Sequence, residues 1–213
     1  MNGTSRTVSI IDTGVANVAS VCAAFRRLNF ESQLTQSAEV IAESDFVVLP
    51  GVGSFSAGMT RLHQLNVVDA IQQRIAKRQP TLAICLGMQL LCSGSEESPQ
   101  TAGLGIFPFK ATRLPQDVTV PQLGWNRVMT VDESLIPSGT AYFANSFCLA
   151  AAPENWSIAR TDYGIKFVSA CWDGPVLACQ FHPELSGHWG QQLLATWLNR
   201  MQPQSVAEVS GSC

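Results

Sequence analysis

Charged residues are scarce in this chain, and neither sign dominates. Only 14% of its 213 residues are Asp, Glu, Lys or Arg, and the formal net charge is -3. With a pI near 5.6, this balance gives no electrostatic case for binding nucleic acid or an anionic membrane. Apolar runs are short, and none approaches the roughly 20 residues that a membrane-spanning helix needs. Because the opening segment MNGTSRTVSIID also lacks a signal-peptide layout, we expect a globular, cytoplasmic protein.

Paired cysteines are also missing. The seven cysteines are an odd number, scattered along the chain without a CxxC pair. This pattern argues against both a disulfide framework and a zinc site, so we expect no metal or other cofactor. Histidine is scarce as well, and the chain has only His63, His182 and His188. A cysteine nucleophile would therefore have few candidate bases.

The stretch TLAICLGMQLLC, residues 81–92, contains a thiol in a distinctive setting. An apolar run leads into Cys85, a glycine follows two positions later, and Met88 to Leu91 take up helical spacing. This pattern predicts a strand, a tight turn and a helix, as in a nucleophile elbow. A cysteine at such a turn faces the positive end of the helix, which favours the thiolate. Cys85 is therefore the candidate nucleophile.

The first half of the chain alternates between strand and helix patterns. Strands are predicted at 7–12, 31–36, 45–50 and up to Cys85, and helices around 18–28 and 67–75, the second one broken. Beyond a polar loop at 93–100, short strand-like runs follow at 103–106, 124–131, 140–149, 156–162, 167–172 and 176–181. We predict an α/β fold with a doubly wound, mostly parallel sheet and antiparallel additions in the second half. A single domain would cover 1–201, with its last helix at about 188–201 and a polar tail at 202–213.

Two further pieces come after strands of this predicted sheet. His182 and Glu184 follow the apolar run VLACQF, and the turn Gly51-Val52-Gly53 follows the strand that ends at Pro50. The carboxyl ends of parallel strands meet at one edge of a sheet, where sites form. There His182 can act as the base for Cys85, and Glu184 can orient the imidazole. The backbone N–H of Leu86 and the glycine turn are candidate oxyanion donors.

Simpler interpretations exist for each piece alone. A cysteine at a strand end is more often a packing residue than a nucleophile, and PGVG is by itself only a turn. We treat Cys92 and Cys148 as core residues, His63 and His188 as surface or cap residues, and the Glu96–Glu97 pair as a solvated loop. The catalytic hypothesis depends on three pieces meeting at one edge of the sheet.

Two motifs together resemble those of a known family. AICLGMQ around Cys85 and QFHPE at 180–184 resemble the elbow and the later HPE of class I glutamine amidotransferases, with Ala83 where the family usually has glycine. PGVGSFSAGM at 50–59, VPQLGWNRV at 120–128 and the early IIDTGVANVAS narrow the resemblance to the glutaminase subunits of imidazole glycerol phosphate synthase. The resemblance implies a flavodoxin-like fold.

The resemblance also implies a reaction and a partner. Glutamine would be hydrolysed through a thioester on Cys85, with His182 as base and acid, and with Gln89, Ser146 and the PGVG turn helping to hold the substrate. Ammonia would then pass through a channel to a (β/α)8-barrel cyclase subunit in a heterodimer that makes imidazole glycerol phosphate for histidine biosynthesis. The residues placed toward that partner are Asn17, Gln122, Trp125, Asn126 and Leu185.

This chain departs from the family pattern at positions away from the three catalytic candidates. Gln122 replaces a usual histidine, Asn145-Ser146-Phe147 replaces HSY, Leu185 replaces a Lys or Arg, and Ala16-Asn17 replaces a GN pair. Two alternatives therefore stay open. One is a specialised paralogue that supplies ammonia to a different barrel partner and acceptor, and the other is a non-catalytic interaction subunit that retains the fold.

Overall fold

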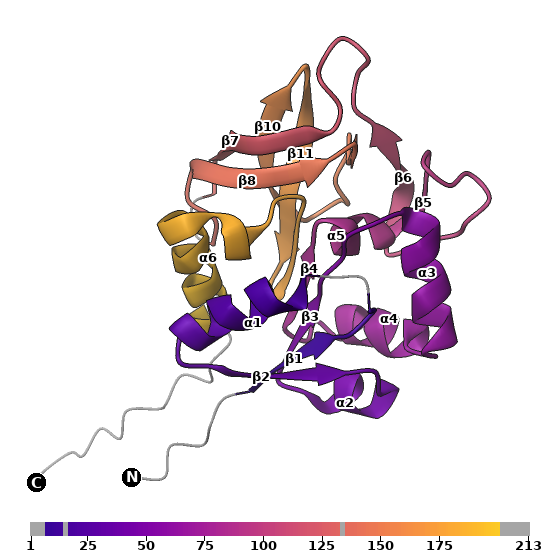
Figure 1. The fold of residues 1–213 in the computed structure, drawn as a ribbon, viewed down its shortest axis with the longest axis vertical. Helices are drawn as coiled ribbons and strands as arrows, with labels where there is room; N and C mark the ends of the chain where they lie inside the picture. Colours follow the sequence, from indigo (N-terminus) through magenta and orange to yellow (C-terminus); the bar gives the residue numbers. More distant parts are fainter. Residues whose placement is uncertain (1–6, 15–16, 133–134, 201–213) are drawn as a thin grey trace, which may run out of the picture.

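The computed structural model describes residues 7–14, 17–132 and 135–200 (Figure 1). Over these ranges the chain forms one large sheet with helices on both faces and a second, small sheet beside it. The tail predicted at 202–213 and Ala16 of the N-terminal motif lie outside the described residues. In the described part of the chain, no helix is both long and apolar enough to cross a membrane.

The large sheet has nine strands in the order β2-β1-β3-β4-β12-β11-β10-β7-β8. Its first five strands are parallel, whereas the other pairings are antiparallel. The parallel strands are β1 (Thr7–Ile11), β2 (Glu31–Thr35), β3 (Phe46–Leu49), β4 (Thr81–Ile84) and β12 (Val176–Cys179), and the antiparallel ones are β7 (Gln122–Thr130), β8 (Gly139–Asn145), β10 (Ser157–Tyr163) and β11 (Ile165–Asp173). The predicted fold class is confirmed.

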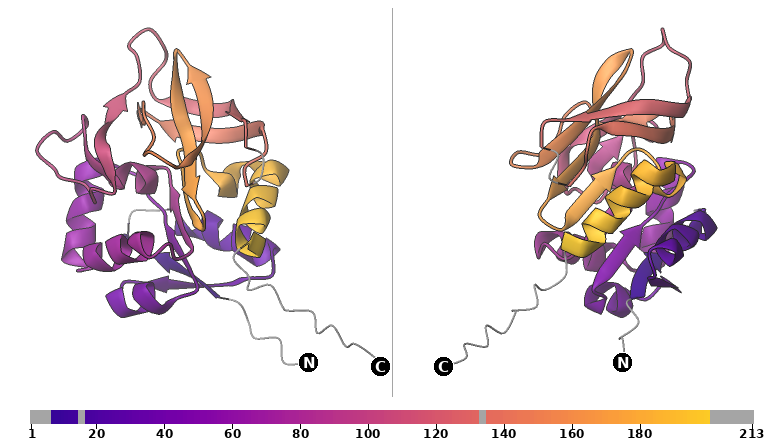
Figure 2. Two further views of the ribbon diagram at one scale, coloured as in Figure 1. Left: turned by 180° about the vertical axis from the view of Figure 1, so that it is seen from behind. Right: turned by 90° about the vertical axis from the view of Figure 1, so that its left-hand side faces the viewer.

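The inner parallel strands β1, β3, β4 and β12 are largely apolar because they are buried on both faces, whereas the edge strand β2 is mostly polar and exposed. Successive residues of β3 show this, since Val48 packs into one core and Val47 into the other. Helices α1 (Val18–Arg27) and α6 (Gly187–Arg200) cover the first core, as Figure 2 shows, and Phe25 of α1 contacts Trp197 of α6. The opposite core lies under α2 (Ala38–Glu43), α3 (Phe55–Gln64), α4 (Val68–Ala76) and α5 (Leu86–Leu90).

Several predicted elements differ from the observed ones. The broken helix consists of two helices, α3 and α4, and α2 was not predicted. Residues 103–106 form no strand, and the polar stretch after Cys92 is partly the strand β5 (Cys92–Ser95). That strand pairs with β6 (Phe107–Arg113), which pairs with β9 (Phe147–Cys148), so these additions form a separate three-stranded sheet. Ser95 is buried because it packs within this pairing, which the polar sequence did not reveal.

Candidate active site

Cys85 lies on a sharp turn between β4 and α5, as predicted. Its backbone has a positive φ of 54° with ψ of -109°, which side chains other than glycine rarely adopt, and Leu86 begins the helix. Gly87 permits the close approach of α5 to the sheet, because a Cβ there would lie 2.1 Å from the carbonyl oxygen of Leu49. The N–H of Cys85 donates to the carbonyl of Cys179 at 2.7 Å, which ties the turn to β12. The strained turn is thus built from the sheet itself.

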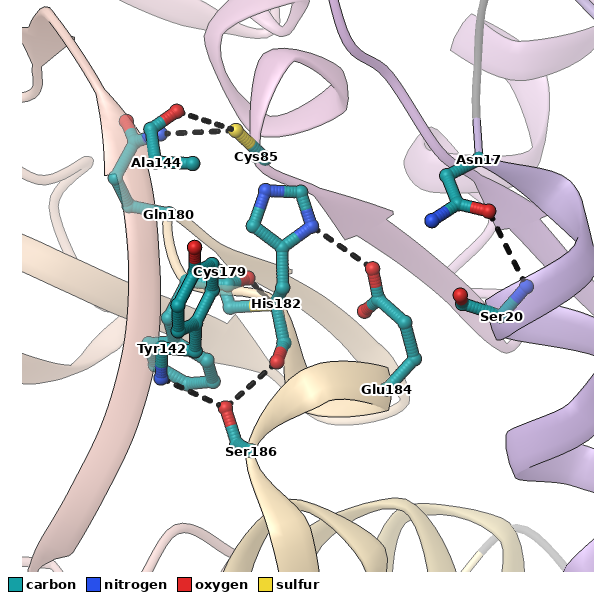
Figure 3. Close-up of polar contacts among 11 residues, drawn as sticks. Asn17, Ser20, Cys85, Tyr142, Ala144, Cys179, Gln180, His182, Glu184 and Ser186 are labelled. Atoms are coloured by element: carbon teal, nitrogen blue, oxygen red, sulfur yellow. Dashed lines mark hydrogen bonds and ion pairs between the residues drawn. The ribbon is translucent and has the colours of Figure 1, made fainter. Parts of the chain in front are cut away.

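The neighbouring strand β12 brings His182 and Glu184 to this turn (Figure 3). Nδ1 of His182 lies 2.8 Å from Oε1 of Glu184, and the Glu184 side chain is only 3% exposed. Ser186 fixes the backbone beneath them, because its hydroxyl donates to the carbonyl of His182 at 2.6 Å and accepts from the N–H of Tyr142. The imidazole therefore lies between Cys85 and Glu184, and Ser186 holds the backbone that carries it.

The surroundings of His182 favour its protonated form. Burial lowers its pKa, but the side-chain interactions with Cys85 and Glu184 and their charges raise it more strongly, to about 10. A protonated imidazole beside a thiol holds a proton ready for transfer. The arrangement can therefore support nucleophilic attack by sulfur followed by proton donation to a leaving group.

A cavity of about 240 Å³ opens beside Cys85. Its walls come from the elbow, from the turn after β3 and from the segment that joins β8 to β9, which together surround the sulfur. The lining residues are Val52, Gly53, Cys85, Leu86, Gln89, Glu97, Ala144, Asn145, Ser146, Phe147 and His182. Of the predicted oxyanion and substrate residues, Val52, Gly53, Leu86, Gln89 and Ser146 are among them, and Gly51 is not.

One of the predicted oxyanion donors, the N–H of Leu86, already has a partner in this structure. The N–H of Leu86 donates to the carbonyl oxygen of Gly51 at 3.4 Å, so a carbonyl of the PGVG turn faces the first candidate donor. Gly51 packs closely against Leu86, because a Cβ added to Gly51 would lie 2.8 Å from the Cβ of Leu86. Gly53 has a φ of 98°, which favours glycine at that position. In this arrangement the Leu86 N–H is directed at the Gly51 carbonyl.

Two residues that lie at this site, Glu97 and Gln180, were not identified from the sequence. Glu97, which we expected in a solvated loop, lines the cavity, and its Oε2 accepts a 2.6 Å hydrogen bond from the N–H of Phe55. Its partner in the pair, Glu96, accepts from the N–H of Arg113. Gln180 is fully buried, and its Nε2 lies 3.6 Å from Sγ of Cys85. The QFHPE motif contained the only sequence signal for Gln180.

The residues predicted at a partner interface have different environments. Trp125 and Leu185 are 59% and 38% exposed, and both are available for contact. Asn17 is exposed and caps α1 through the N–H of Ser20. Gln122 is only 3% exposed, so its side chain does not reach the surface. Asn126 ties β7 to β10, because its amide donates to the carbonyl of Asp162.

Gln122 has a second unusual property. It pairs in register with Asn145, and both polar atoms of its side chain are buried without a hydrogen-bond partner. The side-chain oxygen of Asn145 is also unpartnered.

The six cysteines within the described residues are free thiols, and Cys92 and Cys148 are buried as expected.

Comparison with known proteins identifies the family. The family model described as "Glutamine amidotransferase class-I" matches residues 9–201. The chain belongs to this family. It is therefore a glutamine amidotransferase, and the elbow with Cys85 and the His182–Glu184 pair belong to an enzyme of glutamine chemistry.

Individual relatives are similar over nearly their whole length. The chain is 37% identical over 195 residues to the "Imidazole glycerol phosphate synthase subunit HisH" of Symbiobacterium thermophilum, covering 89% of this chain and 92% of that protein. The Aquifex aeolicus protein with the same name is 38% identical over 203 residues, covering 92% and 98%. A crystal structure titled as a glutamine amidotransferase has a TM-score of 0.74 at 18% identity, covering 91% of this chain and 98% of that one. This last likeness supports the amidotransferase fold.

Proposed function

We propose that this amidotransferase is the glutaminase subunit of an imidazole glycerol phosphate synthase. It would hydrolyse glutamine at Cys85 and supply the ammonia to a (β/α)8-barrel cyclase subunit in histidine biosynthesis. The similarity to relatives with that printed name supports the assignment. The observation that carries the chemistry is the His182–Glu184 pair, 2.8 Å apart beside a buried thiol on a strained turn. We further propose that 1–201 form a single amidotransferase domain, in keeping with the matched residues 9–201.

The first half of the reaction forms a thioester. The thiolate of Cys85 attacks the side-chain amide carbon of glutamine, and the carbonyl electron pair moves to its oxygen. When the tetrahedral intermediate collapses, the imidazolium of His182 gives its proton to the amide nitrogen, which leaves as ammonia. The pKa of His182, raised to about 10, keeps this proton available until the leaving nitrogen takes it.

The second half regenerates the thiol site. Neutral His182 takes a proton from water, and the resulting hydroxide adds to the thioester carbon. Collapse then expels Cys85 as a thiolate and leaves glutamate. Glu184 keeps the imidazole oriented and stabilises its positive charge in both halves.

Glutamine carries an ammonium and a carboxylate on its Cα, and its binding needs a group that faces the ammonium. Glu97 is the acidic side chain among the residues that line the cavity, and we assign it to the α-ammonium of the substrate. Ser146 and Gln89 line the same cavity and are assigned to the polar atoms of glutamine. Opposite charge at close range in a small cavity favours an amino acid over a simple amide.

The oxyanion site requires a change at the PGVG turn. The carbonyl of Gly51 now accepts from the N–H of Leu86, so that donor is not directed at the cavity. We propose that partner binding rotates the turn, frees this N–H and adds an N–H from the turn itself, either of Val52 or of Gly53. Loss of one oxyanion donor costs about 3 kcal/mol in other enzymes, so the unrotated turn predicts low activity.

The partner surface is assigned to the exposed apolar side chains near the catalytic edge. Leu123, Trp125 and Leu185 are all exposed, and β8 beside β7 contacts the His182 backbone through Tyr142. Apolar contact and aromatic anchors are common at the centre of protein interfaces. Docking here would close the site against water, where ammonia becomes ammonium and loses its nucleophilic electron pair.

The direct test replaces the nucleophile. Cys85→Ala should abolish glutamine hydrolysis in the complex with the cyclase, while circular dichroism and partner affinity stay unchanged. Cys22→Ser, at a half-buried position in α1, is the matched control and should keep full activity. Glutamine hydrolysis by the Cys85→Ala complex at the native rate would contradict the proposed function.

A paralogue that serves another acceptor remains the second candidate, because Leu185 is an exposed apolar residue at a position where the family usually has Lys or Arg. Purification of the chain from its own source, with identification of the bound subunit, distinguishes the two. An imidazole glycerol phosphate cyclase supports the first function, and a barrel protein of another pathway supports the second.

A further inference from the structure

A second side chain of the segment that carries His182 also reaches the sulfur of Cys85. Gln180 follows β12 directly, is fully buried, and places its Nε2 3.6 Å from Cys85 Sγ (Figure 3). His182 lies two residues further along the chain, and its side chain also interacts with Cys85. Gln180 and His182 therefore approach the same sulfur from one short segment.

The orientation of the Gln180 amide is fixed by a chain of buried hydrogen bonds. The carbonyl of Phe147 can only accept, and it receives Nε2 of Gln89 at 3.0 Å and Nδ2 of Asn145 at 3.1 Å. The same Nε2 of Gln89 donates to Oε1 of Gln180 at 3.0 Å. Since the oxygen of Gln180 faces Gln89, its N–H group must face Cys85.

An N–H donor at this place favours one form of the sulfur. It can donate to a thiolate, whereas the thiol form would instead direct its own proton at the carbonyl of Ala144, 3.9 Å away. The titratable groups around the sulfur are His182 with Glu184 behind it, Glu97 in the cavity wall and Cys179 on β12. Burial, together with the charges of Glu184 and Cys85, raises the pKa of Cys179, so this neighbour stays a neutral thiol.

We infer that Gln180 is a further catalytic residue, whose amide N–H stabilises the thiolate of Cys85 and holds its sulfur toward the cavity. Gln89 is the positioning residue that keeps this amide from turning over. The inference rests on the proposed role of Cys85 as nucleophile. The same hydrogen bonds connect the reacting sulfur, through Gln180 and Gln89, to the carbonyl of Phe147, a residue that also lines the cavity.

Two variants of nearly equal shape test this role. Gln180→Met keeps the length of the side chain but removes the donor. Gln180→Glu keeps the hydrogen bond from Gln89 and directs an acceptor at the sulfur. Ser169→Ala is the matched control. Ser169 is fully buried, its carbonyl accepts a hydrogen bond from the N–H of Gln180, and its hydroxyl has no partner.

The first measurement is the rate at which iodoacetamide alkylates Cys85 in the full chain across a pH series, followed by peptide mass spectrometry. Cys22 in the same chain is the internal reference. A hydrogen bond to a charged group is worth about 1.5 kcal/mol, so the midpoint of the pH–rate profile should rise by about one unit in Gln180→Met. Alkylation below the midpoint should then be about tenfold slower. Gln180→Glu should be affected at least as strongly, and Ser169→Ala should match the native chain.

The second measurement is steady-state glutaminase activity in the complex with the cyclase. In Gln180→Met, kcat should fall about tenfold with little change in KM, because the lost contact is to the nucleophile and not to substrate. A native pH–rate profile and native kcat in a folded Gln180→Met chain would overturn the inference. If that variant does not fold, the same result for Gln180→Glu overturns it. If native Cys85 is no more reactive than Cys22, the proposed function fails as well, so the two failures are distinguishable.

Discussion

The imidazole of His182 is held between a sulfur and a carboxylate, and its titration reports on both. We predict that Glu184→Gln lowers the pKa of His182 from about 10 by about one to three units, because the variant removes an opposite charge 2.8 Å away. Nuclear magnetic resonance of nitrogen-labelled histidine follows this directly, with the exposed His63 and His188 as reference signals. An unchanged titration of His182 in the variant would mean that Glu184 does not set its charge.

The same shift predicts how stability depends on pH. The folded pKa of His182, about 10, lies above the usual unfolded value of about 6.5, so its protonation stabilises the fold. That contribution should be complete below pH of about 6.5 and should be lost as the pH rises toward about 10. The difference in unfolding free energy between the native chain and His182→Gln, measured by denaturant titration, should therefore shrink over this range. A difference that grows with pH would contradict the assigned charge.

Arg74 is a buried cation whose role is structural. Its guanidinium donates to the carbonyls of Ile41 and Ser44 at 2.7 Å and of Pro80 at 2.9 Å, while burial, opposed in part by the charge of Asp45, lowers its pKa to about 10. Arg74→Met should lower the free energy of unfolding by about 3 kcal/mol, because these carbonyls lose their donor. Lys77→Met, at an exposed position just after α4, is the control and should change it by less than about 0.5 kcal/mol. Equal stability of the two variants would contradict this role.

At the scale of elements, the packing of α5 against β3 sets the position of Cys85. Gly87→Ala should lower the free energy of unfolding by at least about 2 kcal/mol and remove most glutaminase activity, because its Cβ would overlap the Leu49 carbonyl. Gly94→Ala in β5 is the matched control, since a Cβ there would meet its nearest neighbour at 3.4 Å. Thermal unfolding and glutamine hydrolysis measure both effects. Similar losses in both variants would show that the close approach at Gly87 is not what matters.

The sequence predicted the parallel half of the fold and the meeting of Cys85 with His182, because fully buried strands give continuous apolar runs and parallel strands end at one edge. Helix α2 was missed, since its six residues are too few for a clear periodicity. The place of Glu97 was not predictable, because a polar loop carries no signal for the distant N–H of Phe55 that its carboxylate accepts from. The bond from Gln180 to the sulfur likewise depends on packing between elements far apart in the chain.

At the scale of the whole molecule, activity should depend on the partner. We predict that the isolated chain hydrolyses glutamine slowly and that the cyclase with its bound nucleotide raises the rate strongly, because the carbonyl of Gly51 now faces the N–H of Leu86. Steady-state ammonia release with and without the cyclase measures this. Equal turnover in the two conditions would show that the oxyanion site is complete without the partner.

The exposed Leu185 allows a test of partner recognition at the same scale. Leu185 is 38% exposed beside the catalytic segment, and the related family usually has a Lys or Arg there. Leu185→Lys should change affinity for the cyclase or the degree of stimulation, because it introduces a charge into an apolar contact. Titration calorimetry with the cyclase measures the affinity, and an unchanged affinity and stimulation would place Leu185 outside the interface.

The path of the nitrogen tests the central claim most directly. The complex of this chain with the cyclase is given glutamine labelled at its amide nitrogen in a solution of unlabelled ammonium, and the imidazole product is analysed by mass spectrometry. The account predicts labelled product from the native complex and none from Cys85→Ala. Product that carries only the unlabelled nitrogen in the native complex, or label that persists in Cys85→Ala, would contradict it.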